Sequence, residues 1–274
     1  MEKSAPGILM RHTRRWFVGS VLAGLALTVL PGCQTGPVKP WTPGTLRVLS
    51  YNIHHGEAMD KQFDYQRLAK VINDLSPDIV ALQEVDVGTE RASGVNQAAL
   101  LGKLCKMPHA FGQAMPHQGG QYGEAILSRF PIEKGLVHPL PYQFEEEPRA
   151  ALEVRIKPEG IGPIAFVGTH LCHQKVENRV QQTQRLSRLF SKQEGCPVIL
   201  AGDFNARPGS EPMRVLFDAG WTDAVAPRSV IDYVLVRSCD PWKVKEVTVI
   251  AEPVVSDHNP VLVVLEWQGE TMDK

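Results

Sequence analysis

Short apolar runs recur along this sequence, and polar residues end most of them. Alternating or continuous hydrophobic positions predict strands at residues 46–53, 77–83, 122–128, 149–155, 164–171, 197–201, 231–236 and 261–267, with a broadly extended segment at 247–254. The runs at 77–83 and 197–201 are almost entirely apolar, which is typical of buried strands.

Segments with helical periodicity lie between these strands. The spacing of apolar residues predicts helices at 65–75, 97–104 and 174–192, and a further helix that starts at Glu211. Asp64 is placed as the N-cap of the first helix. Strands outnumber helices and the helices are spread among them, which favours an α/β or α+β fold with helices over stacked sheets.

The first 33 residues have the pattern of an export signal. Arg11, Arg14 and Arg15 precede the apolar run 16–30. Residues 13–18 resemble a twin-arginine signal, and Leu30-Pro31-Gly32-Cys33 resembles a lipobox in which Cys33 would be lipidated. A plain cleaved signal or a single membrane anchor is the alternative.

We therefore expect an exported protein, periplasmic or attached to the cell envelope as a lipoprotein. Residues 34–45 contain three prolines and are predicted to form an extended tether. The 274 residues are 43% hydrophobic and 22% charged, enough for one sizeable core, and we place one catalytic domain at 46–268 and a short tail at 269–274.

Net charge and cysteine content narrow the range of possible functions. Residues 1–33 hold four Lys or Arg and one Glu, so the rest of the chain has a net charge of −4, against −1 for the whole. That balance disfavours a non-specific nucleic-acid binder, which usually carries a basic face. Cys105, Cys172, Cys196 and Cys239 match no metal motif, and their pairing stays open.

Polar, metal-ligating or titratable residues stand at the ends of the predicted strands or in the loops beside them: Asn52, Glu84, His170, Asp203, Asn205, Asp257 and His258. Each alone could be a polar turn or a strand end that reaches solvent. In extended chain, Asp203 and Asn205 would point to the same side. If the strands carry all seven to one edge, they form an acidic pocket with two imidazoles, which suits Mg²⁺ or Mn²⁺ and acid–base chemistry by histidine.

Six short motifs connect this pattern to a known family. They are Tyr51-Asn52-Ile53, Leu82-Gln83-Glu84-Val85, Gly168-Thr169-His170-Leu171, Gly202-Asp203-Phe204-Asn205, Ile231-Asp232-Tyr233 and Ser256-Asp257-His258-Asn259-Pro260. In this order they resemble the endonuclease/exonuclease/phosphatase superfamily over residues 45–268. The resemblance implies a four-layered α/β sandwich, two packed mixed sheets with helices outside, and Mg²⁺-dependent cleavage of phosphoester bonds.

The resemblance also implies roles for individual residues. Glu84 would be the main metal ligand, helped by Asn52 and Asp257. Asp203 and Asn205 would orient the attacking water and the phosphate. His258, oriented by Asp232, would be the general acid or base, and His170 would stabilise the phosphate or protonate the leaving group.

Four further residues are candidates for the site. The stretch Tyr122-Gly123-Glu124 resembles the corresponding stretch of secreted deoxyribonucleases, which makes Tyr122 a catalytic candidate and Glu124 a candidate partner of His170. Glu124 could equally be a solvated strand residue. Arg149 and Arg91 are candidate phosphate contacts, with surface salt bridges as the alternative.

The substrate remains open at this point. It could be a small molecule, a nucleic acid or a lipid head group, and either a diester or a monoester. Specificity is expected in the short loops 54–63, 86–97, 113–121, 138–147 and 206–230, which show no run of aromatic residues typical of a membrane-inserting hairpin. A secreted endonuclease acting on DNA or RNA and a non-catalytic binding lipoprotein are the alternatives. The only membrane contact expected is the lipid anchor, and no obligate protein partner is evident.

Overall fold

A computed structural model of the chain describes residues 40–272. The predicted export signal, Cys33 and the first part of the tether lie outside the described residues. Within residues 40–272, no helix has the length and apolar character needed to cross a bilayer. The four cysteines of this part, Cys105, Cys172, Cys196 and Cys239, are free thiols.

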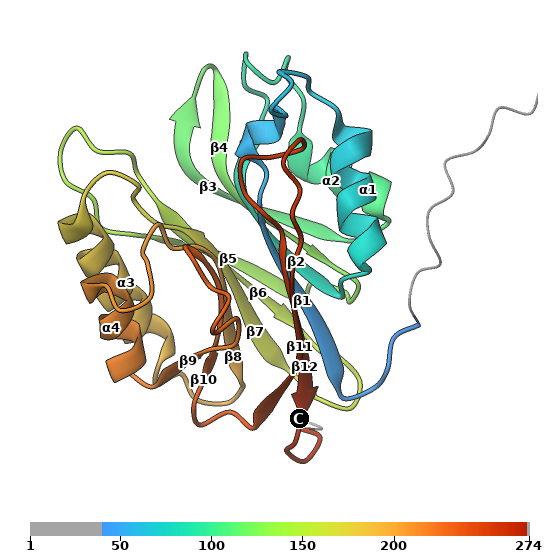
Figure 1. Cartoon of the computed structure of the whole chain (residues 1–274), viewed down its shortest axis with the longest axis vertical. Helices are drawn as coiled ribbons and strands as arrows, with labels where there is room; N and C mark the ends of the chain where they lie inside the picture. The colour runs from blue at the N-terminus through green and yellow to red at the C-terminus, as the bar shows by residue number, and fades with distance from the viewer. Residues whose placement is uncertain (1–39, 273–274) are drawn as a thin grey trace, which may run out of the picture. The chain divides into compact units, whose positions relative to one another are not determined.

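Two six-stranded sheets form the centre of the domain (Figure 1). The first has the order β11-β12-β1-β2-β4-β3, and the second β5-β6-β7-β8-β10-β9. The strands are β1 Thr45–Asn52, β2 Ile79–Val87, β3 His109–His117, β4 Gly120–Ser128, β5 Lys134–Pro139, β6 Ala150–Ile156, β7 Ile164–His170, β8 Val198–Asp203, β9 Trp221–Asp223, β10 Asp232–Arg237, β11 Trp242–Val249 and β12 Val261–Trp267.

Four α-helices cover the outer faces of the two sheets. They are α1 Tyr65–Leu75, α2 Gln97–Cys105, α3 Val176–Phe190 and α4 Glu211–Asp218. One apolar cluster joins α1 and α2 to the first sheet, and a second joins α3 and α4 to the second sheet (Figure 1). The predicted four-layered sandwich of two mixed sheets flanked by helices is therefore confirmed.

Each sheet contains one parallel pair of neighbouring strands, and its other pairs are antiparallel. These pairs are β1–β2 in the first sheet and β7–β8 in the second. Helix α1 connects the first pair and α3 connects the second, as parallel strands require a crossover. The carboxyl ends of both strands of a parallel pair lie at the same edge of the sheet, so each pair presents two strand ends together.

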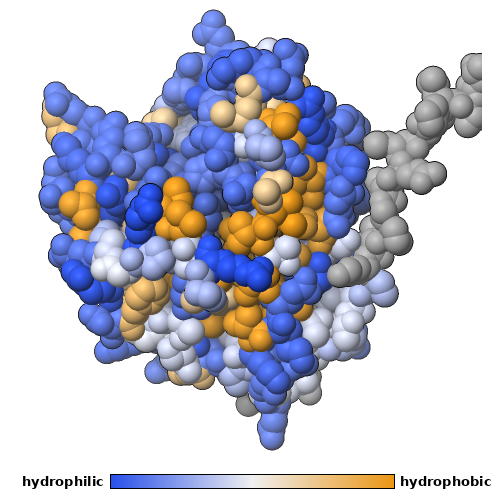
Figure 2. Space-filling view, viewed as in Figure 1, coloured by the Kyte–Doolittle hydropathy of each residue, from blue (hydrophilic) through white to orange (hydrophobic). Residues whose placement is uncertain are grey.

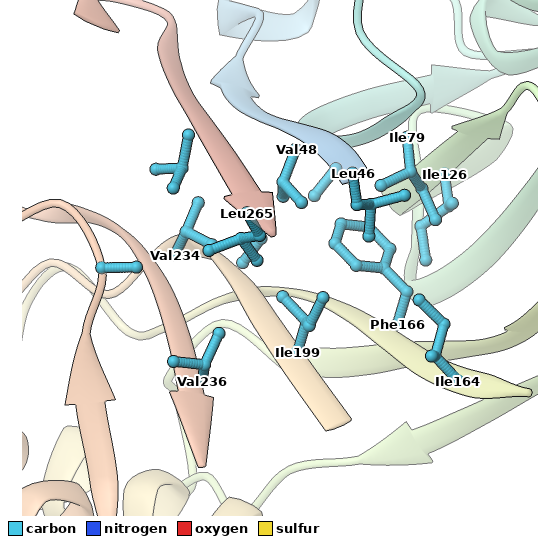
Figure 3. Packing of buried hydrophobic residues seen from close by; sticks show 14 of the residues in the cluster. Leu46, Val48, Ile79, Ile126, Ile164, Phe166, Ile199, Val234, Val236 and Leu265 are labelled. Carbon is cyan, nitrogen blue, oxygen red and sulfur yellow. The ribbon is translucent and has the colours of Figure 1, made fainter. Parts of the chain in front are cut away.

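The largest apolar cluster fills the space between the sheets. Leu46 and Val48 from one sheet pack with Phe166, Ile199 and Val234 from the other (Figure 3). Gly168, two residues before the end of β7, faces this layer, where an added Cβ would lie 3.4 Å from Cβ of Ala81. The sheets therefore approach closely just below the ends of the parallel pairs.

The sequence pattern predicted all eight inner strands of the two sheets but not their edge strands. The four edge strands are β3, β5, β9 and β11; the first three were missed, and β11 begins and ends earlier than the predicted segment 247–254. Edge strands such as β5 are mostly exposed, so they lack the apolar pattern that identifies inner strands. The loop expected at 113–121 is instead largely the β3–β4 hairpin.

Local signals were more successful. The Asp64 carboxylate accepts a hydrogen bond of 3.0 Å from the backbone N–H of Arg67, which confirms it as the N-cap of α1. The predicted strand end at Glu84 is wrong, because β2 continues to Val87.

The close approach at Gly168 can be tested with a matched pair of substitutions. Gly168→Ala should change the free energy of unfolding by less than about 1 kcal/mol, since its Cβ meets only ordinary contact distances. Gly168→Val should lower that free energy by about 1–3 kcal/mol, because its methyl groups overpack the layer between the sheets. Urea denaturation measures both, and equal stability of the two variants would contradict this account of the packing.

Candidate active site

A cavity of about 440 Å³ opens where the ends of the two parallel pairs meet. Its lining is mostly ionisable: His54, His55, Glu84, Arg91, Met115, His117, Tyr122, Glu147, Arg149, His170, His173, Asp203, Asn205 and His258. Strands and loops of both sheets contribute to it. Of the residues selected from the sequence, Glu84, Arg91, Tyr122, Arg149, His170, Asp203, Asn205 and His258 are gathered here.

Asn52 connects the two sheets at the floor of this cavity. Its side chain is fully buried at the end of β1, and its amide nitrogen donates to Oε1 of Glu84 at 3.1 Å and to Oδ2 of Asp203 at 3.3 Å. Its oxygen accepts from the backbone N–H of His54 at 3.0 Å. One carboxamide thus holds a carboxylate of each sheet in place.

A bulge in β2 places Glu84. The pairing of β2 with β4 shifts register between Leu82 and Val85, and Glu84 has a left-handed φ of +59°. A bulge interrupts the alternation of side chains along a strand. Gln83 is consequently fully buried, while the next side chain, Glu84, reaches the cavity.

Glu84 is held ionised. Burial acts to raise the pKa of its carboxyl, but the nearby His55 and the amide of Asn52 outweigh it and lower that pKa below the ordinary value. Nδ1 of His55 lies 3.7 Å from Oε2 of Glu84.

The oxygen-rich floor fits a hard divalent cation. Glu84 offers an ionised carboxylate, and the carboxylate of Asp203 lies across the Asn52 amide from it. Asn52 points its amide nitrogen at both carboxylates, and its oxygen is bonded to the backbone N–H of His54, so in this orientation Asn52 positions Glu84 and does not offer it a neighbouring oxygen ligand. Mg²⁺ and Mn²⁺ prefer such oxygen ligands. Asp203, Asp232 and His258 form a second group whose ligand atoms all lie within 4.8 Å of one another.

Asp203 is the centre of the hydrogen-bonding network. Its Oδ2 lies 3.3 Å from Nε2 of His170 and 3.5 Å from Nε2 of His258, while Oδ1 accepts from the backbone N–H of Asn205 at 2.8 Å. Burial and the charge of Asp232 raise the pKa of Asp203 to about 7, although His258 opposes this. A carboxyl with that pKa exchanges a proton near neutral pH.

Asn205 reaches the site by a turn, not by the extended chain expected from the sequence. It has φ of +47°, in the left-handed region that Asn tolerates better than most residues. Its amide nitrogen donates to the carbonyl of Leu171 at 3.1 Å and lies 3.0 Å from Nε2 of His170. The side chains of Asp203 and Asn205 are neighbours, as predicted, but a turn of the backbone brings them together instead of an extended chain.

His258 and Asp232 form the pair that the resemblance implied. Nδ1 of His258 lies 3.2 and 3.0 Å from the two oxygens of Asp232, which fixes the orientation of the ring. Burial acts to lower the pKa of His258, but the bond and charge of Asp232 and the charge of Asp203 raise it to about 9. His258 is therefore a cation at neutral pH.

His170 has the opposite character. It is almost completely buried, and burial followed by the charge of Arg149 holds its pKa well below the ordinary value. Nη1 of Arg149 donates to Nδ1 of His170 at 2.9 Å, so in the neutral ring Nε2 carries the hydrogen and faces Asp203. His170 is thus a neutral hydrogen-bond donor, not an acid.

The expected pairing of Glu124 with His170 is wrong, because Arg149 occupies Nδ1. Glu124 is fully buried, and neither of its oxygens has a hydrogen-bond partner among the described residues. Burial raises the pKa of Glu124 well above its ordinary value, which favours the uncharged form. The solvated position offered as the alternative is also wrong.

Tyr122 lies close to both candidate phosphate-binding arginines. The guanidinium carbons of Arg91 and Arg149 lie 5.4 and 6.0 Å from the centre of its ring. Arg91 binds Asp86 at 2.7 and 3.0 Å, and Arg149 binds Glu147 at 2.9 Å. Both arginines are therefore in salt bridges, but both also line the cavity, where they present positive charge.

Asp257 lies outside the lining of the candidate active site. It is exposed and lines a smaller neighbouring cavity. In the loop before β12, His258 lines both cavities, whereas Asp257 lines only the smaller one. The role of Asp257 as a metal ligand beside Glu84 stays a prediction.

Sequence reasoning did not select the other six lining residues: His54, His55, Met115, His117, Glu147 and His173. Six of the nine histidines of the chain line this cavity, and that concentration is invisible in the linear sequence. The adjacent pair His54-His55, directly after the predicted strand 46–53, was the one local signal available.

Comparison with known proteins gives consistent matches. The model of the endonuclease/exonuclease/phosphatase family matches residues 49–258. Protein YbhP of Escherichia coli strain K12 is 28% identical over 182 residues, which cover 62% of this chain and 72% of YbhP. The inositol phosphosphingolipids phospholipase C of Saccharomyces cerevisiae is 28% identical over 173 residues, 54% of this chain and 34% of that protein. The crystal structure of an endonuclease/exonuclease/phosphatase from Beutenbergia cavernae DSM 12333 matches with a TM-score of 0.68 and 25% identity, over 82% of this chain and 72% of that chain.

The elevated pKa of His258 provides a test of the pair with Asp232. Asp232→Asn should move the NMR-detected pKa of the His258 imidazole from about 9 toward the ordinary 6.5. Since the pKa is raised in the folded protein, the pair stabilises the fold fully below pH 6.5, and this stabilisation is lost as the pH rises through about 9.

Urea denaturation should therefore show wild type losing more stability than Asp232→Asn over that pH range. The His258→Asn variant identifies the NMR signal of the His258 imidazole, because that signal is missing from its spectrum. An unchanged pKa in Asp232→Asn would show that Asp232 does not control this imidazole.

Proposed function

The chain belongs to the endonuclease/exonuclease/phosphatase family, and from this premise we propose that it is an exported, metal-dependent phosphoesterase that cleaves phosphoester bonds with water. The observation that carries the proposal is the position of Asp203, which lies beside His170 and His258 in one cavity and accepts a hydrogen bond from the buried Asn52. The yeast relative is named for phospholipase C activity, which supports diesters among the possible substrates.

In the proposed reaction, Glu84 would be the main ligand of the cation, and the amide of Asn52 would hold Glu84 in place. A bound Mg²⁺ or Mn²⁺ would neutralise phosphate charge and the charge that develops on the leaving oxygen. Because its pKa lies below the ordinary value, the carboxyl group of Glu84 is ionised at neutral pH.

The proton chemistry divides between two side chains. Asp203, whose pKa of about 7 lies near neutrality, accepts a proton from the attacking water. His258, whose pKa of about 9 keeps it charged, donates to the phosphate or the leaving oxygen. Asp232 holds the ring of His258, and the neutral His170 donates a hydrogen bond.

Substrate phosphate would be positioned by the basic wall of the cavity. Arg149 and Arg91 present guanidinium groups close to the ring of Tyr122, and Asn205 also lines the cavity with its amide. A guanidinium group can donate two parallel hydrogen bonds to two oxygens of a phosphate, which fixes the orientation of the phosphate as well as balancing its charge. Their partners Glu147 and Asp86 hold the two arginines in place before substrate arrives.

The role of His258 can be tested by turnover of a chromogenic phosphodiester and the matching monoester with Mg²⁺ or Mn²⁺. His258→Ala should lower kcat by about 10²–10⁴-fold, the range typical of a positioned acid or base. His109→Ala, an exposed histidine of β3 outside the cavity, is the control and should retain the wild-type rate. Unchanged kcat in His258→Ala would reject the assignment.

The role of Glu84 can be tested by metal dependence. Glu84→Gln should raise the Mn²⁺ concentration needed for half-maximal rate and weaken Mn²⁺ binding in calorimetry, because a neutral amide replaces an ionised ligand. Glu90→Gln alters an exposed glutamate in the following loop and serves as the control. If the variant binds Mn²⁺ as tightly as wild type, Glu84 has only a structural role.

The same assays separate the alternatives. Loss of all ester hydrolysis with EDTA supports metal dependence, and cleavage of DNA or RNA with steep salt dependence would favour a secreted endonuclease. Metal binding without turnover on any ester or nucleic acid would favour a binding lipoprotein.

A further inference from the structure

Two adjacent histidines lie in a tight turn at the mouth of the candidate active site. They belong to the 3₁₀ turn η1, His54–Gly56, which follows the end of β1. His54 and His55 both have left-handed φ values, of +46° and +43°. This conformation is uncommon for residues other than glycine, and where surrounding contacts maintain it, the residue often serves a functional site. Both histidines line the cavity, and the proposed reaction uses neither of them.

Contacts with β1 and α2 hold this turn in place. The backbone N–H of His54 donates to Oδ1 of Asn52 at 3.0 Å, so the residue that positions Glu84 also positions the turn. Nε2 of Gln97 donates to the carbonyl of His55 at 2.6 Å. The position of His55 is therefore set by the packing of the domain.

Glu57 orients the imidazole of His55. Oε2 of Glu57 lies 3.3 Å from Nε2 of His55, and Oε1 of Glu57 lies 3.3 Å from Nζ of Lys61. A carboxylate only accepts hydrogen bonds, so Nε2 carries the hydrogen of this contact. The other ring nitrogen, Nδ1, lies 3.7 Å from Oε2 of Glu84. A histidine that binds a metal generally donates from its second nitrogen to a carboxylate or a carbonyl, as His55 does here.

The separation of His55 and Glu84 fits two ligands of one ion. A carboxylate oxygen and a ring nitrogen with a lone pair repel each other unless a proton or a metal ion lies between them. A hydrogen bond would bring the two atoms to about 2.7–3.2 Å. Two ligand atoms at about 2.1 Å from one ion lie about 3.0–3.4 Å apart, in octahedral and tetrahedral geometry respectively. The observed 3.7 Å is closer to the second case.

A hydrated cation can reach this pair from solvent. The side chains of His55 and Glu84 are 14% and 22% exposed. Residues 54–56 form the short blue helical turn near the top of Figure 1, and this end of the molecule is mostly hydrophilic in Figure 2.

We propose that Nδ1 of His55 binds the same cation as Glu84, and that this imidazole makes the site prefer a transition-metal ion to Mg²⁺. The inference rests on the metal site of the proposed function and narrows the identity of its ion. Imidazole nitrogen is a good ligand for first-row transition metals such as Fe²⁺, Co²⁺ and Zn²⁺. Mg²⁺ prefers oxygen ligands and keeps several of its water molecules. Glu57 acts as a positioning residue that keeps Nδ1 directed at the ion.

Calorimetry with Co²⁺ and with Mg²⁺ tests the preference in wild type, His55→Asn and His109→Asn. Asn tolerates a left-handed φ and carries an amide oxygen near the position of Nδ1, so His55→Asn should keep the turn and offer oxygen in place of nitrogen. It should lower the affinity for Co²⁺ at least about tenfold and change that for Mg²⁺ less than about threefold. His109→Asn makes the same change at an exposed residue of β3 outside the cavity and should keep both affinities.

Two further measurements address the ligand itself. Glu57→Ala removes the partner of Nε2 and should lower the ratio of Co²⁺ to Mg²⁺ affinity about tenfold, as expected when a metal-binding histidine loses its outer hydrogen bond. In proton NMR of the Co²⁺-loaded protein, the paramagnetic ion should shift the exchangeable Nε2–H signal of His55 far outside the ordinary range. This signal should be missing from His55→Asn.

An equal ratio of the two affinities in wild type and His55→Asn would overturn the proposal, and so would an His55→Asn spectrum that keeps every shifted N–H signal of wild type. The hydrolysis assays distinguish this failure from failure of the proposed function. Selective Co²⁺ binding through His55, in a protein that hydrolyses no ester or nucleic acid, would support the ligand and reject the phosphoesterase. Metal-dependent hydrolysis with an unchanged ratio in His55→Asn would reject the ligand and keep the phosphoesterase. Binding of neither ion would reject both.

Discussion

The close packing of the two sheets is the constraint on which the candidate site depends. Gly168 lets β7 approach Ala81 of the facing sheet, just below the strand ends. Only at this distance can Asn52 of one sheet donate to Asp203 of the other at 3.3 Å. Because each sheet has a parallel pair at this edge, four strand ends meet there, and the fold supplies a site built from both halves of the chain.

The chemistry of the site lowers the local stability of the fold. Asp203, His170 and Arg149 are almost completely buried, and burying charged groups is unfavourable unless other groups compensate. The network distributes charge among its members: burial favours the neutral forms of His170 and Glu124, and His258 carries the positive charge beside Asp232. Such a distribution, with two neighbouring groups of opposite pKa shift, is typical of acid–base sites.

The groups that act on phosphate come from the ends of the parallel strands, and family membership fixes little beyond the reaction class. A smaller cavity lies beside them, lined by residues of the segment 228–232, by Val249 and Val261 of the β11–β12 ladder and by the loop before β12. Its lining combines apolar side chains with charged ones.

The sequence by itself determined the inner strands, the fold class and the polar residues that end β1, β7 and β8. These features follow from local patterns: apolar runs mark strands buried on both faces, and the N-cap of α1 depends on a residue three positions away. The edge strands β3, β5 and β9 escaped prediction because solvent on one side leaves no apolar pattern in their residues.

Tertiary structure alone decided which polar residues act together. The bulge that directs Glu84 into the cavity, the binding of Arg149 to His170 in place of Glu124, and the position of Asp257 at the smaller neighbouring cavity depend on contacts between distant segments. So does that smaller cavity itself, which combines residues of the segment 228–232 with β11 and β12. The chain order contains no local trace of such contacts, because they arise only when the two sheets pack and fix the distances between their strand ends.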